Sequence, residues 1–152
     1  MANVEYPQFK INSSGSNTLL GFKAGKNITT GTENVAIGSI ALEDNTTGSG
    51  NTAVGRECLM NNQGGGSNTA VGKLALTTNS SGSSNTALGH KALRLSNTSN
   101  NVGVGFESGY NNAGTENVFM GYQAGHGVAA SSENVAVGSQ TMTSTNTNGN
   151  NV

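Results

Sequence analysis

The chain has 152 residues, a length that suits a single domain. More than half of the residues are Gly, Asn, Ser or Thr and only 33% are hydrophobic, which excludes a conventional core of large apolar side chains. A formal net charge of −1 gives no basic field for nucleic acid, and no apolar run approaches the roughly 18 residues of a membrane span.

The first 16 residues precede any repeat and hold the single proline, Pro7. Their apolar residues alternate at Val4, Tyr6, Phe9 and Ile11, which predicts a short strand. We expect residues 1–16 to be an N-terminal capping or docking segment and residues 17–152 to be a repeat domain. The opening residues MANVEYPQFK lack the basic and apolar regions of a signal peptide.

From residue 17 onward the sequence repeats every 16 or 17 residues. Each copy opens with an asparagine and reaches a glycine four residues later, as in NTLLG at 17–21 and NTAVG at 51–55. The asparagines are Asn17, Asn34, Asn51, Asn68, Asn85, Asn101, Asn117 and Asn134. The glycines are Gly21, Gly38, Gly55, Gly72, Gly89, Gly105, Gly121 and Gly138. A repeat this short and this regular predicts a solenoid, because one copy cannot bury its own apolar side.

Each copy contains two short segments with apolar residues. The first reads Thr or Val, then usually Ala, then a large aliphatic residue, an alternation typical of a strand. The second follows the glycine and places a small residue before a Leu, Met or Gly. Glycine and asparagine in every copy argue against helix. We therefore predict an all-β parallel β-solenoid of about eight 17-residue turns, with two short strands in each turn and turns stacked about 4.8 Å apart.

Stacked turns place equivalent residues in columns, and each column then has a physical role. The asparagines are expected to form a side-chain ladder, and the glycines to occupy a corner that needs positive φ or close backbone approach. The large aliphatic residues, including Val54, Val71 and Leu88, are expected to fill the interior. The small residues of the strand are expected to face outward against another chain, which predicts an oligomer; they are Ala36, Ala53, Ala70, Ala87 and Ala136.

The segments NTAVGKLAL at 68–76 and NVAIGSIAL at 34–42 resemble the repeat of trimeric autotransporter adhesin heads, which also occurs in bacteriophage tail-fibre and neck-fibre proteins. The resemblance covers residues 17–152 and implies a left-handed β-roll with three chains around one axis. The turns rich in Thr, Ser, Asn and Gly are similar to the phage type. We therefore expect a homotrimeric, non-enzymatic fibre module of a phage virion, from the tail, neck or capsid.

Two other function classes are weighed against the phage fibre. One is a bacterial surface adhesin head or a self-assembling extracellular filament subunit, and the lack of a visible signal peptide favours the virion over it. The other is an enzyme on a solenoid scaffold, which is disfavoured because no column gathers carboxylates, His or Arg. Asn151 and Val152 open a ninth copy that stops, so we expect the C-terminal face to dock end-on to another copy or another virion or fibre protein.

Chemistry-bearing residues are few, and we predict no catalytic residue, cofactor or metal site. His90 and His126 are expected to be solvated surface residues, with a ligand role as the alternative. Cys58 is expected to be a buried small residue. Glu116 and Glu133 fall in consecutive turns and are expected to be solvated, or neutralised by a bound cation.

Four aromatic residues are candidate surface contacts: Phe22, Phe106, Tyr110 and Tyr122. Exposed aromatic rings pack on sugar faces and anchor protein contacts. We therefore expect them to contact a host-surface glycan or protein, and packing within the oligomer is an equal alternative.

Overall fold

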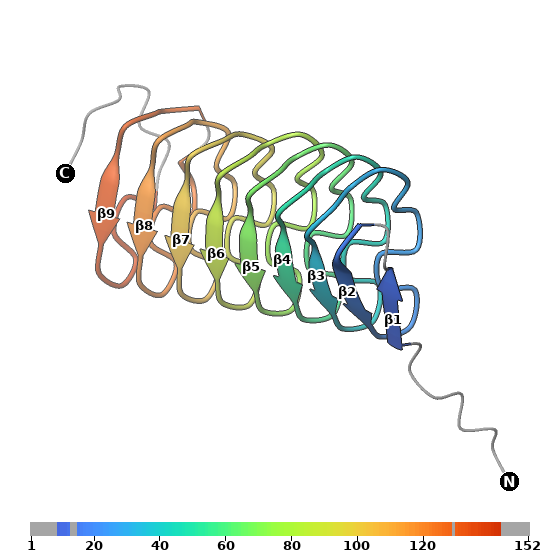
Figure 1. Cartoon of the computed structure of the whole chain (residues 1–152). Helices are drawn as coiled ribbons and strands as arrows, with labels where there is room; N and C mark the ends of the chain where they lie inside the picture. Colours follow the sequence, from blue (N-terminus) through green and yellow to red (C-terminus); the bar gives the residue numbers. More distant parts are fainter. Residues whose placement is uncertain (1–8, 13–14, 129, 144–152) are drawn as a thin grey trace, which may run out of the picture.

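The Thr/Val-Ala-aliphatic triplet of each repeat forms one short strand, and these strands lie side by side along a solenoid (Figure 1). The structure is a computed structural model and describes residues 9–12, 15–128 and 130–143. The strands are β1 (Phe9–Asn12), β2 (Asn17–Leu20), β3 (Val35–Ile37), β4 (Thr52–Val54), β5 (Thr69–Val71), β6 (Thr86–Leu88), β7 (Val102–Val104), β8 (Val118–Met120) and β9 (Val135–Val137).

The strands form one nine-stranded sheet in chain order. β2 to β9 are all parallel, and equivalent residues of neighbouring repeats are partners, as Ala53 and Ala70 are in β4 and β5. The parallel β-solenoid predicted from the repeat is thereby confirmed. β1 pairs antiparallel with β2, with Phe9 opposite Leu20, and so occupies the edge of the parallel array.

The second segment of each repeat does not form the second strand that the sequence led us to expect. Two of its positions adopt left-handed backbone, as Glu57 (φ 58°) and Leu59 (φ 48°) do, and a residue in that region cannot extend a strand. The turns are nevertheless joined there by backbone hydrogen bonds, since the Leu59 amide donates to the carbonyl of Ala75 at 3.0 Å. Each turn therefore has one strand and one hydrogen-bonded irregular segment.

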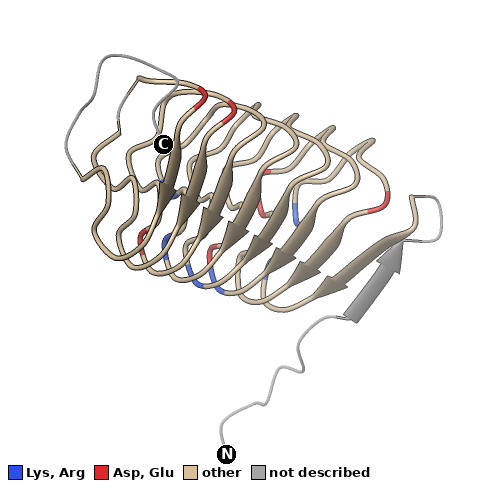
Figure 2. Ribbon diagram, turned by 90° about the vertical axis from the view of Figure 1, so that its left-hand side faces the viewer, with Lys and Arg blue, Asp and Glu red and all other residues tan. Residues whose placement is uncertain are grey.

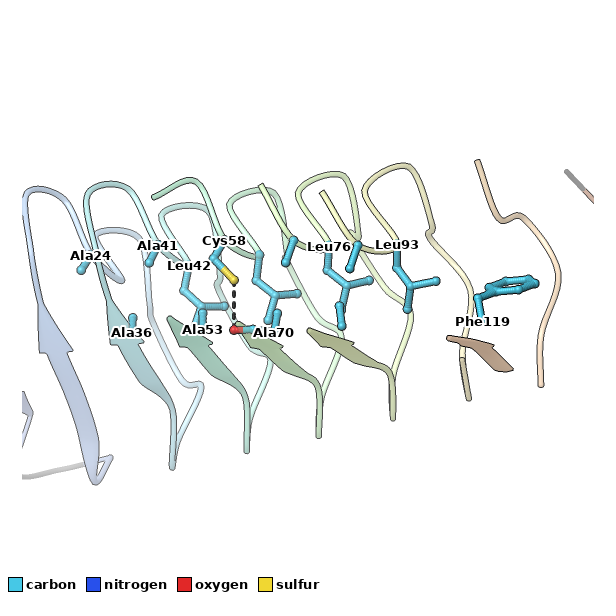
Figure 3. Close-up of a cluster of buried hydrophobic side chains, with 14 of the residues drawn as sticks. Ala24, Ala36, Ala41, Leu42, Ala53, Cys58, Ala70, Leu76, Leu93 and Phe119 are labelled. Atoms are coloured by element: carbon cyan, nitrogen blue, oxygen red, sulfur yellow. Dashed lines mark hydrogen bonds between the residues drawn. The ribbon is translucent and has the colours of Figure 1, made fainter. Parts of the chain in front are cut away.

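The interior is lined by the opposite residues from those predicted. The strand alanines, such as Ala53 and Ala70, are fully buried, whereas Leu88 is 47% and Val137 is 62% exposed. The roll is too narrow for a large side chain from the strand in most turns, because the second segment already fills it with leucine. Four leucines stack as this inner row: Leu42, Leu59, Leu76 and Leu93 (Figure 3).

Large residues enter the interior from the strand only where the second segment carries glycine. Leu19 faces Gly25, and a Cβ atom on that glycine would lie 2.6 Å from the Leu19 Cδ2 atom. Phe119 is fully buried in the same way opposite Gly125. One large side chain in each of these turns therefore fills the space, whichever segment supplies it.

The predicted asparagine ladder is present and buried. The amide nitrogen Nδ2 of Asn51 donates to Oδ1 of Asn34 at 3.1 Å and to the carbonyl of Gly65 at 2.9 Å. The same Oδ1 of Asn34 accepts from the backbone N–H of Asn51 at 3.0 Å. Each asparagine side chain thus hydrogen-bonds both to the neighbouring turn and to the far corner of its own turn. These bonds fix the register between turns.

The repeat glycines also behave as predicted. Gly55 has φ of 136°, and a Cβ atom there would lie 2.6 Å from the carbonyl oxygen of Gly72 in the next turn. Both the conformation and the contact exclude a side chain.

A second buried asparagine column was missed by the sequence analysis. Asn62 Nδ2 donates to Asn45 Oδ1 at 2.7 Å, and Asn79 Nδ2 donates to Asn62 Oδ1 at 2.9 Å. These residues lie 11 positions after a repeat asparagine, and that spacing was the available signal.

Candidate functional site

The outer surface of the sheet is a long uncharged face. We call the outward residues of β2 to β9 the sheet face: Thr18, Leu20, Val35, Ile37, Thr52, Val54, Thr69, Val71, Thr86, Leu88, Val102, Val104, Val118, Met120, Val135 and Val137. Every one is aliphatic, threonine or methionine, and five of the large ones are well exposed. The prediction that the strand alanines face outward is wrong; the aliphatic and threonine columns face outward instead.

Charged side chains gather on the turn that follows each strand (Figure 2). We call the first, second and fifth residues after each repeat glycine the charged edge. It carries six of the seven lysines and arginines and both histidines: Lys23, Lys26, Arg56, Lys73, Lys91, Arg94, His90 and His126. Glu33, Glu116 and Glu133 each precede a strand, at the other edge of the sheet.

The first column of the charged edge contains a row of rings. The rings of Phe106 and Tyr122 are stacked, with centroids 5.3 Å apart and planes 10° from parallel. His90 meets Phe106 edge-on at 5.4 Å. The stack runs along the solenoid axis, because successive members come from successive turns.

The fifth column contains a second row parallel to the first. The rings of Tyr110 and His126 stack at 5.0 Å with planes 12° apart. The Arg94 guanidinium lies over the other face of the tyrosine, 5.6 Å from its centroid, and its Nη1 donates to the tyrosine hydroxyl. A cation on an aromatic face at this distance is a stabilising contact.

Glu107 lies in the column between the two rows. Its Oε1 accepts from Lys91 Nζ at 2.9 Å, and its Oε2 accepts from Gln123 Nε2 at 3.0 Å and lies 3.5 Å from His126 Nε2. Burial opposes ionisation of the carboxyl, but the bonds from Gln123 and Lys91 and the charges of Lys91 and His126 outweigh it, so the pKa of Glu107 is lowered. The carboxylate thus cross-links three turns.

The structure separates the four aromatic candidates. Phe106, Tyr110 and Tyr122 belong to the two rows, whereas Phe22 stands near the N-terminal end with Lys23 Nζ 5.4 Å from its ring centroid. The contributions of Lys91, Arg94, Glu107 and Gln123 were missed. Their signal was the 16-residue spacing of equivalent positions, which brings unlike polar residues together in three consecutive turns.

The remaining candidates are the two histidines, two glutamates and the cysteine. His90 and His126 lie at the surface but are half-buried in the rows, so they are less solvated than predicted, because neighbouring rings cover part of each. Glu116 and Glu133 are exposed and left-handed (φ 60° each). Cys58 is buried as predicted; its thiol donates to the Ala70 carbonyl at 3.1 Å, and burial raises its pKa to about 12.

Within residues 9–12, 15–128 and 130–143, no three His, Cys, Asp or Glu side chains are grouped as metal ligands. Over the same residues, no helix has the length and apolar character needed to cross a membrane. Comparison with protein families, curated proteins and solved structures finds no match to this chain. The Asn151–Val152 docking prediction lies outside the described residues.

Proposed function

We propose that this chain is a non-enzymatic structural module of a bacteriophage virion fibre that assembles as a homotrimer through the sheet face. The observation that carries the proposal is the composition of that face: eight parallel strands present sixteen outward side chains without a charge among them. A soluble sheet surface normally carries charged residues, and an exposed apolar patch of this extent marks a protein contact.

The geometry of the face favours a copy of the same chain as its partner. Threonine and valine make up one column, as Thr69, Thr86 and Val102 show, and aliphatic residues form the other. Both columns repeat with the spacing of the turns, so an identical surface offers matching ridges along its whole length. The repeat's resemblance to fibre and adhesin heads supports three chains around one axis.

The ends of the sheet support a fibre assembled end to end. β1 covers the β2 edge, whereas β9 is hydrogen-bonded only to β8 among the described residues. Exposed strand edges recruit further strands. We propose that another fibre or virion protein docks at the β9 end of the sheet.

Analytical ultracentrifugation of the wild type and of Val71→Asp tests the trimer. The wild type is expected to sediment with three times the 15.3 kDa chain mass. Val71→Asp places a charge at the centre of the sheet face and is expected to release monomers with the β circular dichroism of the wild type. Thr47→Asp adds the same charge at an exposed residue away from the strands and is expected to remain trimeric.

A monomeric wild type at micromolar concentration would refute the trimer. Retention of the trimer by Val71→Asp would remove the sheet face from the interface. Virion localisation is tested separately, by labelling phage particles with an antibody to the purified chain; unlabelled fibres would refute it.

A further inference from the structure

We propose that the part of the charged edge from Lys73 to His126 binds an acidic polysaccharide. This goes beyond the proposed structural role by giving the module a ligand site and naming the chemistry of the ligand. The site combines two rows of aromatic rings with cationic side chains of the charged edge, since Lys91 and Arg94 lie in the same few turns as the rows.

The two rows end at the same turn. Tyr122 is 50% exposed, one face of its ring is covered by Phe106, and the next residue of its column is the exposed Ser139. His126 is covered by Tyr110 on one face and is followed in its column by Thr143, also exposed. Small residues therefore follow large rings in both columns, which leaves a step where a sugar ring can pack against an aromatic face.

Amide groups lie between the two ring faces at this step. Gln123 belongs to the same turn as the rings, and the Gln140 side chain follows it, with Nε2 3.4 Å from the Gln123 Oε1. Gln140 is exposed. An amide offers both donors and an acceptor, which suits the hydroxyl groups of a saccharide.

Cations extend from the step toward the N-terminal turns. Lys73 is exposed and Arg94 is half-buried, and neither forms an ion pair with a carboxylate among the described residues. Glu107, the carboxylate of the charged edge in these turns, is already bonded to Lys91 and Gln123. Carboxylate or phosphate groups on the ligand would therefore meet unneutralised guanidinium and ammonium groups.

The composition favours a polysaccharide over a protein or a nucleic acid. Protein interface cores are depleted in charged residues, and that description fits the sheet face and not the charged edge. Single-stranded nucleic acid needs free aromatic faces for successive bases. Here Phe106 is enclosed between His90 and Tyr122, so the row offers one free face at its end. A chain with one stacked sugar and anionic groups along its length matches this arrangement.

Binding is measured by isothermal titration calorimetry on the intact protein. The acidic probes are alginate oligosaccharide and polysialic acid, which carry carboxylates, and glycerol-phosphate teichoic acid, which carries phosphate. Dextran is the neutral polymer and oligo(dT) the nucleic acid. At least one acidic probe is expected to bind ten-fold more tightly than both dextran and oligo(dT), and the acid that binds identifies the anionic group.

Variants assign the site. Tyr122→Ala and Arg94→Ala are each expected to weaken binding at least ten-fold. Their matched controls are Phe22→Ala and Lys26→Ala, which change the same columns near the N-terminal end and are expected to bind like the wild type. Sedimentation and circular dichroism of all four variants are expected to be unchanged, since these side chains lie off the sheet face.

Three results would overturn the proposal: no binding of any acidic probe, equal or tighter binding of dextran or oligo(dT), or the same loss in the control variants. A trimer that fails to bind would refute the polysaccharide site and leave the structural role standing. A monomer that binds would refute the trimer and leave the polysaccharide site standing.

Discussion

Replacing one asparagine of the buried ladder tests how the solenoid is held together. Asn68→Ala removes four side-chain hydrogen bonds. Asn68 Nδ2 donates to Asn51 Oδ1 at 3.0 Å and to the Gly82 carbonyl at 2.9 Å. Its Oδ1 accepts from the backbone N–H of Asn85 at 3.0 Å and from Asn85 Nδ2 at 3.1 Å.

The partners differ in what they lose. Asn51 Oδ1 still accepts from the Asn68 backbone N–H, and the Gly82 carbonyl still accepts from Asn79 Nδ2 at 2.9 Å. The Asn85 amide nitrogen Nδ2 still donates to Thr98. Only the backbone N–H of Asn85 is left buried without an acceptor.

These losses set the size of the effect. Three bonds whose partners remain satisfied contribute about 1 kcal/mol each, and one orphaned buried N–H costs about 1–3 kcal/mol, which together give about 4–6 kcal/mol. That exceeds the usual cost of a point substitution, about 0.5–3 kcal/mol. The effect is expected to be severe because the lost bonds join three turns of a solenoid in which each turn contacts only its neighbours.

Urea unfolding followed by circular dichroism measures the loss. The experiment is run on the Val71→Asp background once that variant is shown to be monomeric, so that dissociation does not contribute. Asn111→Ala, at an exposed position outside the ladder, is the control and is expected to change the unfolding free energy by less than about 0.5 kcal/mol. A loss below about 1.5 kcal/mol for Asn68→Ala would refute the reasoning, since it would mean that water replaces the ladder at little cost.

Further predictions concern the core and its titratable groups. Phe119→Ala is expected to lower the unfolding free energy by about 3–5 kcal/mol in urea titrations. Adding Gly125→Leu is expected to recover part of this loss, because Leu42 and Leu59 adopt the same left-handed backbone; no recovery would contradict volume compensation. Native Cys58 is expected to resist a thiol reagent at pH 8, since burial holds its pKa at about 12, and rapid labelling of folded protein would show otherwise. The pKa of Glu107 is lowered from 4.5, so its stabilisation is present above that pH and is lost as the pH falls through the folded-state pKa. Glu107→Gln is therefore expected to reduce the acid-side slope of stability in denaturation curves from pH 3 to pH 7, and an unchanged slope would contradict the role of Lys91 and His126.

The surface rows were only partly accessible to sequence reasoning. Phe106, Tyr110 and Tyr122 stand out by residue type, but their arrangement depends on which column each occupies. Two consecutive 16-residue repeats keep positions 94, 110 and 126 in one column, so a cation, a phenol and an imidazole meet face to face. The lowered pKa of Glu107 depends on partners from the turns on either side of it, which no local motif specifies.

The period of the repeat was sufficient to predict the parallel solenoid, its asparagine ladder and its glycine corner, but not which side of the strand faces in. In a three-residue strand either the middle residue or the two outer residues face inward. Hydrophobicity alone favours the wrong choice here, because valine is more apolar than alanine. The deciding term is volume: the leucine of the second segment occupies the narrow interior and leaves room only for alanine.

The sequence does hold a signal for that choice, in two of the three turns whose second segment has glycine. In the third turn Gly103 and Gly109 are both glycine, and the neighbouring Leu93 and Phe119 side chains fill the space. Where the strand's middle residue is Leu19 or Phe119, the second segment has Gly25 or Gly125 in place of leucine. The outward aliphatic column shows no such exchange. Its larger members, such as Leu20 and Met120, are followed by the repeat glycine in the same way as its valines are. Residues that compensate for each other's volume share an interior. The exchange therefore assigns the alanine column to the core and leaves the valine column on the outer surface.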